Sequence, residues 1–416
     1  MPRDEVTSID LLIINAEELI TLQGPNHPRK KEEMNELGII KKGMLAIDHG
    51  HIVDVGADLD YDAEKVIDAT GYIVIPGFVD PHTHLVFGGS REFELDWKLR
   101  GYSYMDIRRK GGGIDYTVSH TRDASFDSLY QQSKTRLDNM LTYGTTTCEA
   151  KSGYGLNLET EQRILDVQNQ LNKDHLIDIV STFLGAHSIP KEMKDEEYVD
   201  LVIDEMIPLA QPRAEFCDVF CEEGFFSIDQ SRRILNAGKK AGLTPKIHAD
   251  ELVDTNGGML AAEVGAISAE HLLKTNTKSM KQMAEKNVIG VMLPGTPFSL
   301  MMKEYAPARK MIDVGVPLAL ATDLNPNCYV ENMQFMMQLG CFNMKMTPAE
   351  ALTAATFNAS CAINREQKIG SLEVGKQADV LILSIPNYKM IPYHFGVNHV
   401  STVIKNGMIV KSNDKE

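Results

Sequence analysis

The stretch GFVDPHTHLVFGGSRE, from Gly77 to Glu92, places two histidines, separated by one threonine, where an apolar run ends. The run that leads into it, YIVIPGFV (72–79), is typical of a buried strand. Residues i and i+2 of a strand point to the same side, so His82 and His84 are predicted to lie side by side, within reach of one metal ion. An isolated His-x-His pair is more often two unrelated polar residues, so the metal interpretation requires further ligands elsewhere in the chain.

The central part of the chain alternates short apolar runs with helical patterns. Helical patterns cover 128–144, 158–174 and 230–242. Strands that alternate with helices indicate parallel βα units, and eight such units predict a (β/α)8 TIM barrel, here over residues 76–365. The eight apolar runs are 72–84, 144–152, 177–187, 216–224, 243–251, 265–271, 287–295 and 316–326.

Both ends of the chain have strand-and-turn patterns instead of helical ones. Neither end has enough apolar residues for a good core of its own. We therefore predict one small β-sandwich domain that is built from residues 1–75 and 366–416 together. The polar segment 22–40, which holds two prolines, is predicted to be a surface loop.

Composition and charge narrow the class of protein. The 416 residues are 43% hydrophobic and 24% charged, as in ordinary globular proteins, and the net charge is −16. This charge argues against nucleic acid or an anionic membrane as a partner. No apolar segment is long enough to span a bilayer, and no secretory signal pattern is found. The six cysteines have no disulfide-framework spacing, so we expect a reduced, cytoplasmic protein in which Cys217 and Cys221 are buried in a strand.

Ionisable and polar residues gather where the apolar runs end. In a barrel those ends form one face, and such enzymes carry their active sites there. Three imidazoles and a carboxylate suit Zn²⁺ or Fe²⁺ with a position left open for water, whose pKa the metal lowers toward ~7. The natural ligands are His82, His84, His248 and Asp323, and the other residues at these ends are Lys151, Tyr154, His187, Glu251, His271 and Asn325.

Two further residues have a functional and a structural interpretation each. Glu251 follows His248 by three positions, which suits a proton shuttle beside a metal water; the alternative is a surface carboxylate. Arg91 follows GGS (88–90), where glycines let the backbone approach a ligand, so its guanidinium is a candidate for gripping a carboxylate. The alternative for Arg91 is a surface ion pair with Glu92 or Glu94.

Several motifs resemble those of the imidazolonepropionases, a family within the amidohydrolase superfamily. The resemblance covers nearly the whole chain, and GGSRE, KSGYG and PYHFGVNHV are its most specific parts. The other motifs are PHTH, SYMDIRRKGGGI, TFLGAHSIP, KIHADE, ATDLNP and GKQADVLIL.

The resemblance implies a function and a set of site residues. It implies hydrolytic ring opening of 4-imidazolone-5-propanoate to N-formimidoyl-L-glutamate in histidine degradation. It implies metal ligands at His82, His84, His248 and Asp323, and proton transfer shared among Glu251, His271 and Asp323. Family members have a glycine and a serine or threonine where this chain has Asn327 and Cys328, so a hydroxyl contact is lost here. The substrate contacts implied are Arg91, Tyr104, Tyr154, His187, Glu251 and Asn325, with Asn327 and Cys328 as weaker candidates.

The resemblance also implies one metal ion per chain, a small-molecule substrate and a homodimer. Binuclear relatives bridge their metals with a carboxylated lysine after the fourth strand, and the run FCDVFCEEG (216–224) ends without one. Lys151, after the second strand, remains the alternative bridge. Three other functions are alternatives. One is a related single-metal deaminase of an aromatic ring, and another is an inactive relative that kept the barrel, which the intact ligands disfavour. The third is a plain metal-binding or storage protein, which would give Arg91 and Glu251 no reason to share the predicted rim.

Overall fold

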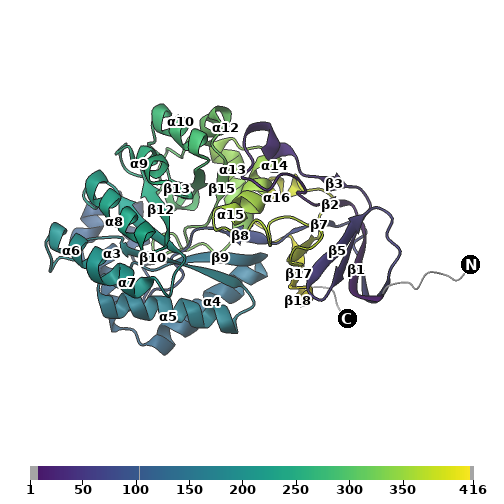
Figure 1. Cartoon of the computed structure of the whole chain (residues 1–416), viewed down its shortest axis with the longest axis horizontal. Coiled ribbons are helices and arrows are strands. Elements are labelled where there is room, and N and C mark those ends of the chain that lie inside the picture. The colour runs from purple at the N-terminus through teal and green to yellow at the C-terminus, as the bar shows by residue number, and fades with distance from the viewer. Residues whose placement is uncertain (1–7, 103, 413–416) are drawn as a thin grey trace, which may run out of the picture.

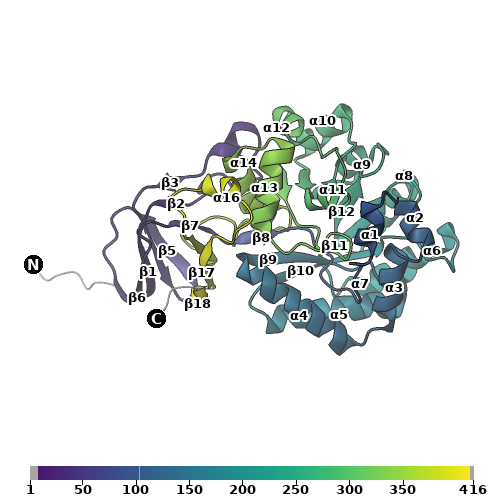
Figure 2. The ribbon, with the colours of Figure 1, turned by 180° about the vertical axis from the view of Figure 1, so that it is seen from behind.

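The structure is a computed structural model that describes residues 8–102 and 104–412. It contains a barrel of alternating strands and helices, with a smaller unit of two sheets on one side (Figure 1). The view from behind places the same unit beside the barrel, next to β8 and α13 (Figure 2).

Eight parallel strands form the barrel wall, paired in the order in which they follow one another along the chain. A parallel bridge between Thr83 and Leu324 joins the ends of the first and last strands, so the wall is nearly closed. This confirms the predicted (β/α)8 class, and each predicted run contains one of the strands. The strands are β8 (Phe78–Asp80), β9 (Thr145–Lys151), β10 (Asp178–Ala186), β11 (Phe216–Cys221), β12 (Thr244–Ala249), β13 (Ser268–His271), β14 (Ile289–Met292) and β15 (Leu318–Leu320).

Helices cover the outside of the barrel, and several begin at a side-chain cap. Ser125, Asn157, Ser227 and Asn276 each accept a hydrogen bond from a first-turn backbone N–H, which satisfies donors that the helix leaves free. The three predicted helical patterns correspond to α4, α5 and α8. The helices are α1 (Glu94–Leu99), α2 (Tyr104–Arg109), α3 (Ile114–Asp123), α4 (Phe126–Thr142), α5 (Leu158–Asp174), α6 (Asp195–Leu201), the π-helical turn Val202–Met206, α7 (Ile207–Ala210), α8 (Ile228–Lys240), α9 (Gly257–Val264), α10 (Thr277–Lys286), α11 (Gly295–Ser299), α12 (Ala308–Val314), α13 (Met333–Met344), α14 (Pro348–Ala355) and α15 (Phe357–Cys361).

The smaller unit contains strands from both ends of the chain. A four-stranded sheet has the order β5-β4-β1-β6, and a six-stranded sheet has the order β18-β17-β16-β7-β2-β3. One apolar cluster joins the sheets and includes Leu45, Val74 and Val380. The composite unit is as predicted, while its boundaries near residues 76 and 366 stay a prediction. Its elements are β1 (Ser8–Ala16), β2 (Glu18–Ile20), β3 (Ile39–Ile40), β4 (Gly43–Asp48), β5 (His51–Gly56), β6 (Asp62–Asp68), β7 (Ile73–Pro76), β16 (Val380–Leu383), α16 (Met390–Tyr393), β17 (Val400–Lys405) and β18 (Met408–Ser412).

Two local predictions were wrong. The run 72–84 is two strands, because β7 pairs with β16 in the smaller unit and only β8 enters the barrel. Segment 22–40 is not simply a surface loop, since it holds a 3₁₀ turn (Lys31–Asn35) and buries Arg29 and Met34. The Nη1 and Nη2 groups of Arg29 donate to the carbonyl oxygens of Glu36 and Leu22, which offsets part of the cost of burying this cation.

Side chains alternate between the inside and the outside of the barrel wall. Cys148, Cys217, Ile247 and Ala269 belong to the apolar cluster shared with the outer helices. The positions next to them point inward because strand side chains alternate. Apolar inward residues pack with α15 in a separate cluster. Five others are charged and buried: Glu149, Lys151, Asp218, Lys246 and Glu270.

The part of the chain that the structure describes has no helix long and apolar enough to cross a membrane. All six cysteines are free, and Cys217 and Cys221 are buried in β11, as predicted.

Asp80 connects the first and last strands of the barrel. Its carboxylate accepts hydrogen bonds from the backbone N–H of Thr322, at 3.1 Å, and from the Thr322 hydroxyl, at 2.5 Å. Both residues are fully buried. These bonds hold the Asp323 segment against β8.

We expect Asp80→Ala to lower the free energy of unfolding by roughly 2–5 kcal/mol, because two buried donors lose their acceptor at about 1–3 kcal/mol each. Urea denaturation measures this, with Asp80→Asn, which retains one acceptor oxygen, as the matched control. Equal stability of Asp80→Ala and the unmodified chain would contradict this account of barrel closure.

Candidate active site

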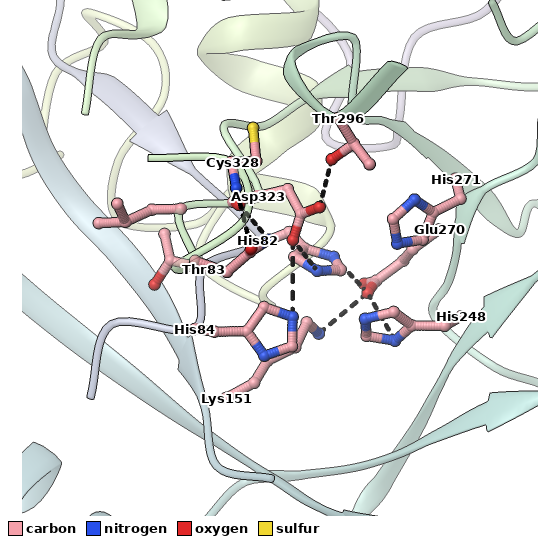
Figure 3. Close-up of polar contacts among 12 residues, drawn as sticks. His82, Thr83, His84, Lys151, His248, Glu270, His271, Thr296, Asp323 and Cys328 are labelled. Atoms are coloured by element: carbon pink, nitrogen blue, oxygen red, sulfur yellow. Dashed lines mark hydrogen bonds and ion pairs between the residues drawn. The ribbon is translucent and has the colours of Figure 1, made fainter. Parts of the chain in front are cut away.

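His82 and His84 follow β8 and point to the same side, as predicted. Both imidazoles are buried. Their Nε2 atoms lie 3.3 and 3.5 Å from the same oxygen, Oδ1 of Asp323, which follows β15 at the other side of the closure (Figure 3). The interpretation of His82 and His84 as two unrelated polar residues is therefore wrong.

Two more histidines complete the cluster from neighbouring strands. His248 belongs to β12, and its ring centroid is 4.6 Å from that of His82. His271 ends β13, and its ring nitrogens lie within 4.8 Å of ligand atoms of both. The same distance limit holds for ligand atoms of His82, His84 and Asp323. All four predicted metal ligands thus converge, with His271 beside them.

The cluster has the unsatisfied atoms that a metal ion would need. His82 Nε2, His248 Nε2 and Asp323 Oδ1 are buried and have no hydrogen-bond partner. Buried polar atoms normally have partners, and nitrogen and carboxylate donors are those that Zn²⁺ and related ions take. The residues present therefore fit a divalent metal.

The backbone at the cluster is unusual. His271, Asp323 and Asp250 have φ values of 71°, 53° and 52°, in the left-handed region that few non-glycine residues occupy. Such strain is found where surrounding structure imposes it, often at functional sites. The Thr296 hydroxyl donates to Asp323 Oδ2, which leaves Oδ1 toward the histidines.

A buried charge network lies directly beneath the histidines. The Lys151 ammonium is 2.7 Å from Glu149 Oε1, 2.8 Å from Asp218 Oδ2 and 2.9 Å from Glu270 Oε2. Lys246 lies 3.4 Å from Glu149 and 3.2 Å from Glu270 Oε1. We call these five residues the charge layer.

The charge layer bears on whether Lys151 could bridge two metal ions. Burial alone would lower the pKa of Lys151, but Asp218, Glu149 and Glu270 raise it above its ordinary value, so Lys151 is an ammonium. A carboxylated lysine forms from the neutral amine and would add a negative charge among three carboxylates. The structure therefore argues against Lys151 as a bridge to a second metal.

A cavity of about 140 Å³ opens above the cluster. The His84 and His187 rings stack at 4.8 Å, and the Nδ1–H of His187 donates to the Gly153 carbonyl at 3.1 Å. Burial, with a contribution from His248, lowers the pKa of His187 to about 3, and burial lowers that of His271 to about 3. Both are neutral imidazoles near pH 7. Of the predicted site residues, the cavity wall includes His84, Arg91, Tyr154, His187, His248, Glu251, His271, Asp323, Asn325 and Asn327.

Arg91 has one feature of each of its two interpretations, an ion pair with a glutamate and a position suited to gripping a carboxylate. It forms a two-pronged ion pair with Glu94, Nε to Oε1 at 2.8 Å and Nη2 to Oε2 at 2.9 Å. It is not a surface residue, however, because it is 7% exposed and lines the cavity. Glu94 Oε1 also accepts from the Gly113 N–H at 2.7 Å, so the guanidinium is held in one orientation.

Glu251 lies on the cavity wall between His271 and the solvent side. Its side chain is 13% exposed, and its Oε2 is 3.7 Å from His271 Nε2. Burial, together with the charges of Asp323 and Glu222, raises the pKa of Glu251 to about 8. The surface-carboxylate interpretation is therefore wrong.

In the segment that follows Asp323, the position of the Cys328 thiol differs from the prediction. Asn325 Oδ1 accepts from the backbone N–H groups of Asn327, at 2.7 Å, and Cys328, at 3.0 Å. Asn327 faces the cavity and accepts from Lys98 at 2.7 Å. The Cys328 thiol, a candidate substrate contact from the sequence, instead packs toward the Thr322 carbonyl, away from the histidines (Figure 3). The turn that Asn325 closes directs the Cys328 thiol into the protein interior and not into the cavity.

Tyr104 begins α2, but its side chain lies outside the described part of the chain.

Sequence reasoning missed the charge layer and the apolar wall. Charged residues at inward positions of strands that are buried on both faces were the available signal, for example Glu149 and Lys151 two apart in β9. Apart from Phe220, which lies in β11, the apolar wall residues come from loops and short helices, where no periodicity marks them. They are Ile114, Phe220, Phe225, Leu252 and Leu300.

The fold and the site together define a metal-dependent amidohydrolase. Two models described as amidohydrolase family match residues 65–103 and 229–410. Among solved structures, a triazine hydrolase variant aligns with a TM-score of 0.79 at 16% identity, over 97% of this chain and 95% of that one. An adenosine deaminase from Xanthomonas campestris aligns with a TM-score of 0.74 at 18% identity, over 98% and 94%. At these identities the likeness concerns the fold alone.

Sequence relatives give the family. An imidazolonepropionase from Alkaliphilus metalliredigens is 54% identical over 97% of this chain and 98% of its own, and one from Geobacillus kaustophilus is 53% identical over 97% and 99%. One from Streptococcus pyogenes is 48% identical over 96% and 97%. The chain belongs to the imidazolonepropionase family.

We expect one tightly bound divalent metal ion per chain, and we expect His82→Ala to lose metal and activity together, because His82 belongs to both groups of converging ligand atoms. Elemental analysis of the purified protein measures this. His175→Ala is the control, since His175 pairs with Asp138 on the outside of the barrel. Two equivalents of metal, both needed for activity, would contradict the single-metal site.

Proposed function

We propose that this chain hydrolyses the ring amide of 4-imidazolone-5-propanoate to N-formimidoyl-L-glutamate, a step of histidine degradation. The observation that carries the proposal is the 48–54% identity, along nearly the whole chain, to relatives named imidazolonepropionase. The cavity supports it, since a fixed guanidinium, a carboxyl and a metal-competent cluster all line it.

Substrate binding is assigned to the residues that line the cavity. Arg91, already oriented by Glu94, would hold the propionate carboxylate through charge-assisted hydrogen bonds. Tyr154, His187 and Asn325 would contact the ring and its polar atoms, and Asn327 is a further polar contact at the wall. The Cys328 backbone supports this loop, while its thiol has no role toward substrate.

We propose that His82, His84, His248 and Asp323 hold one metal ion, Zn²⁺ or Fe²⁺/Fe³⁺. Two solved structures of the same fold contain bound zinc, the Xanthomonas deaminase and an atrazine chlorohydrolase from Arthrobacter aurescens, and this supports zinc. When bound, such an ion lowers the pKa of water and polarises a carbonyl group.

Ring opening requires one proton to leave the attacking water and one to reach the departing ring nitrogen. Water adds to the amide carbonyl carbon, the bond from that carbon to the ring nitrogen breaks, and the nitrogen leaves protonated. We assign the transfer to Glu251, whose carboxyl faces the cavity. With a pKa of about 3, His271 is neutral near pH 7, so it suits a hydrogen-bonding role. Asp323 can accept a proton only at a higher energetic cost, because its pKa lies well below the ordinary range. His82 and Thr296 hold it there against the effect of burial.

The test is to mix the purified, metal-loaded protein with freshly prepared 4-imidazolone-5-propanoate. We expect loss of the ring absorbance and formation of formimidoylglutamate without ammonia. Ammonia release in stoichiometric amounts would favour the deaminase alternative. The deaminases among the fold relatives do not favour it, because they are only 16–18% identical to this chain.

The wider setting of the reaction is also a proposal. Six free cysteines support a reducing, cytoplasmic location. The homodimer stays a prediction that analytical ultracentrifugation can test.

We expect Arg91→Ala to cost about 2–5 kcal/mol in transition-state binding, measured as kcat/KM, because a desolvated charge pair with the substrate is lost. Metal content and fold should be retained. Arg91→Lys is the matched control: it keeps the charge but not the two-pronged geometry, so its loss should be intermediate. Near-normal kcat/KM for Arg91→Ala would leave Arg91 with a structural role only.

We expect Glu251→Gln to lower kcat by ~10²–10⁴ with metal retained and KM within about tenfold, because the shape persists and the base is lost. The carboxylate form is the active one, so activity should rise with pH as Glu251 loses its proton. The midpoint of this acid limb of the activity profile should lie between 4.5, the ordinary pKa of a glutamate, and about 8, because a bound metal cation favours the charged form of Glu251.

Kinetics across pH separate this assignment from its alternative. If His271 takes the proton instead, Glu251→Gln will mainly raise KM, and His271→Ala will carry the loss of kcat. An acid limb that is unchanged in Glu251→Gln would rule Glu251 out as the base.

A further inference from the structure

Lys151 has no direct contact with the cavity, yet it touches the residues that touch the metal-site histidines. Glu270 Oε2 is 2.6 Å from His82 Nδ1, and the same oxygen is 2.9 Å from the Lys151 ammonium. Asp218 Oδ2 is 3.0 Å from His248 Nδ1 and 2.8 Å from the same ammonium. One cation therefore holds the two oxygens that face two different histidines.

This arrangement sets the protonation of both imidazoles. A carboxylate oxygen that is held by an ammonium accepts hydrogen bonds and does not donate them. The proton of a neutral imidazole must then sit on Nδ1 of His82 and of His248. The lone pair of each neutral ring consequently lies on Nε2, the nitrogen turned away from that carboxylate, which in His82 faces Asp323 Oδ1 at 3.3 Å.

We propose that Lys151 is a positioning residue for the metal centre: through Glu270 and Asp218 it fixes the Nδ1–H tautomer and the ring orientation of His82 and His248, so that both Nε2 atoms are presented to one ion. The inference rests on the metal site of the proposed function. Outer partners of this kind commonly contribute tenfold to a hundredfold to metal affinity.

The third carboxylate of the charge layer connects Lys151 to the His-Thr-His segment itself. Glu149 Oε2 accepts from the Thr83 N–H at 3.4 Å, and the Glu149 carbonyl accepts from the Thr83 hydroxyl at 2.7 Å. Thr83 lies between the two histidines, so the strand that carries them is anchored to the same group of charges.

A purely structural role would make Lys151 equivalent to Lys246, which is equally buried. Lys246 contacts Oε1 of Glu270, the oxygen that does not face a histidine, and donates to the carbonyls of Pro81 and Ala362 at 3.2 and 3.4 Å. Lys246→Met is therefore the matched control, which removes a buried cation of the same layer without removing the hold on Glu270 Oε2 or Asp218 Oδ2.

The first test needs no variant and no substrate. ¹⁵N NMR of histidine-labelled, metal-free protein reports which ring nitrogen carries the proton. We expect His82 and His248 as Nδ1–H tautomers at a pH above about 9, because Glu270 and Asp323 raise the pKa of His82 to about 9 against the effect of burial, and the signals are assigned by their loss in His82→Ala and His248→Ala. An Nε2–H tautomer at either residue would overturn the proposal.

The second test measures Zn²⁺ affinity by chelator competition. We expect Lys151→Met to weaken binding by about tenfold to a hundredfold or more, and Lys246→Met to weaken it by less than threefold at a similar loss of stability. The Co²⁺-substituted spectrum should change in Lys151→Met alone. Wild-type affinity in folded Lys151→Met would overturn the proposal.

A third set of variants tests the proposal if Lys151→Met does not fold. Glu270→Ala should alter the tautomer signal of His82 more than that of His248, because Glu270 Oε2 is 2.6 Å from the first and 3.8 Å from the second, and Asp218→Ala should alter that of His248, each with weaker Zn²⁺ binding. Unchanged signals in both would overturn the proposal. All these readouts are independent of turnover, so an enzyme that does not accept imidazolone propionate would refute the proposed function and leave this result standing.

Discussion

The mutual pairing of five charged side chains inside the barrel is the constraint on which the rest of the structure depends. Two lysines and three carboxylates lie at inward positions of strands that are covered on both faces, so water cannot solvate them. A buried charge without a partner costs several kcal/mol, and breaking one pair leaves another charge exposed to a low-dielectric interior. The five groups must therefore meet in one arrangement, which sets the strand register and the orientation of the histidines above them.

The site builds upward from that layer. Apolar residues and α15 fill the lower part of the barrel, the charge layer lies above them, and the imidazoles of His82, His84, His248 and His271 lie above the charges. The same closure that completes the barrel brings Asp323 next to His82, since Asp80 binds Thr322 one residue before it. Barrel closure and assembly of the metal site are consequently one event, and the left-handed backbone at Asp323 is part of its cost.

Burial and neighbouring charges give the ionisable groups that share the cavity different pKa values. Burial keeps His187 and His271 neutral, while it raises the pKa of the Glu251 carboxyl toward the neutral range. Groups with pKa values that are driven apart in one cavity can take different roles in proton transfer. Arg91 is held apart from this region by its pair with Glu94, which orients a cation at the cavity wall without drawing it toward the metal ligands.

Much of the fold and of the site followed from local patterns in the sequence. The eight strands, the composite unit from both ends and the ligands His82, His84, His248 and Asp323 were all predictable, because periodicity and strand-end position are properties of neighbouring residues. The partners of those ligands were not predictable, since Asp218 meets His248 only because β11 pairs with β12. The orientation of Cys328, the pairing of Arg91 with Glu94 and the burial of Arg29 also came from the tertiary structure alone. Contacts across strands and loops depend on how distant segments are brought together, and only the closed barrel decides which charges share an interior without water.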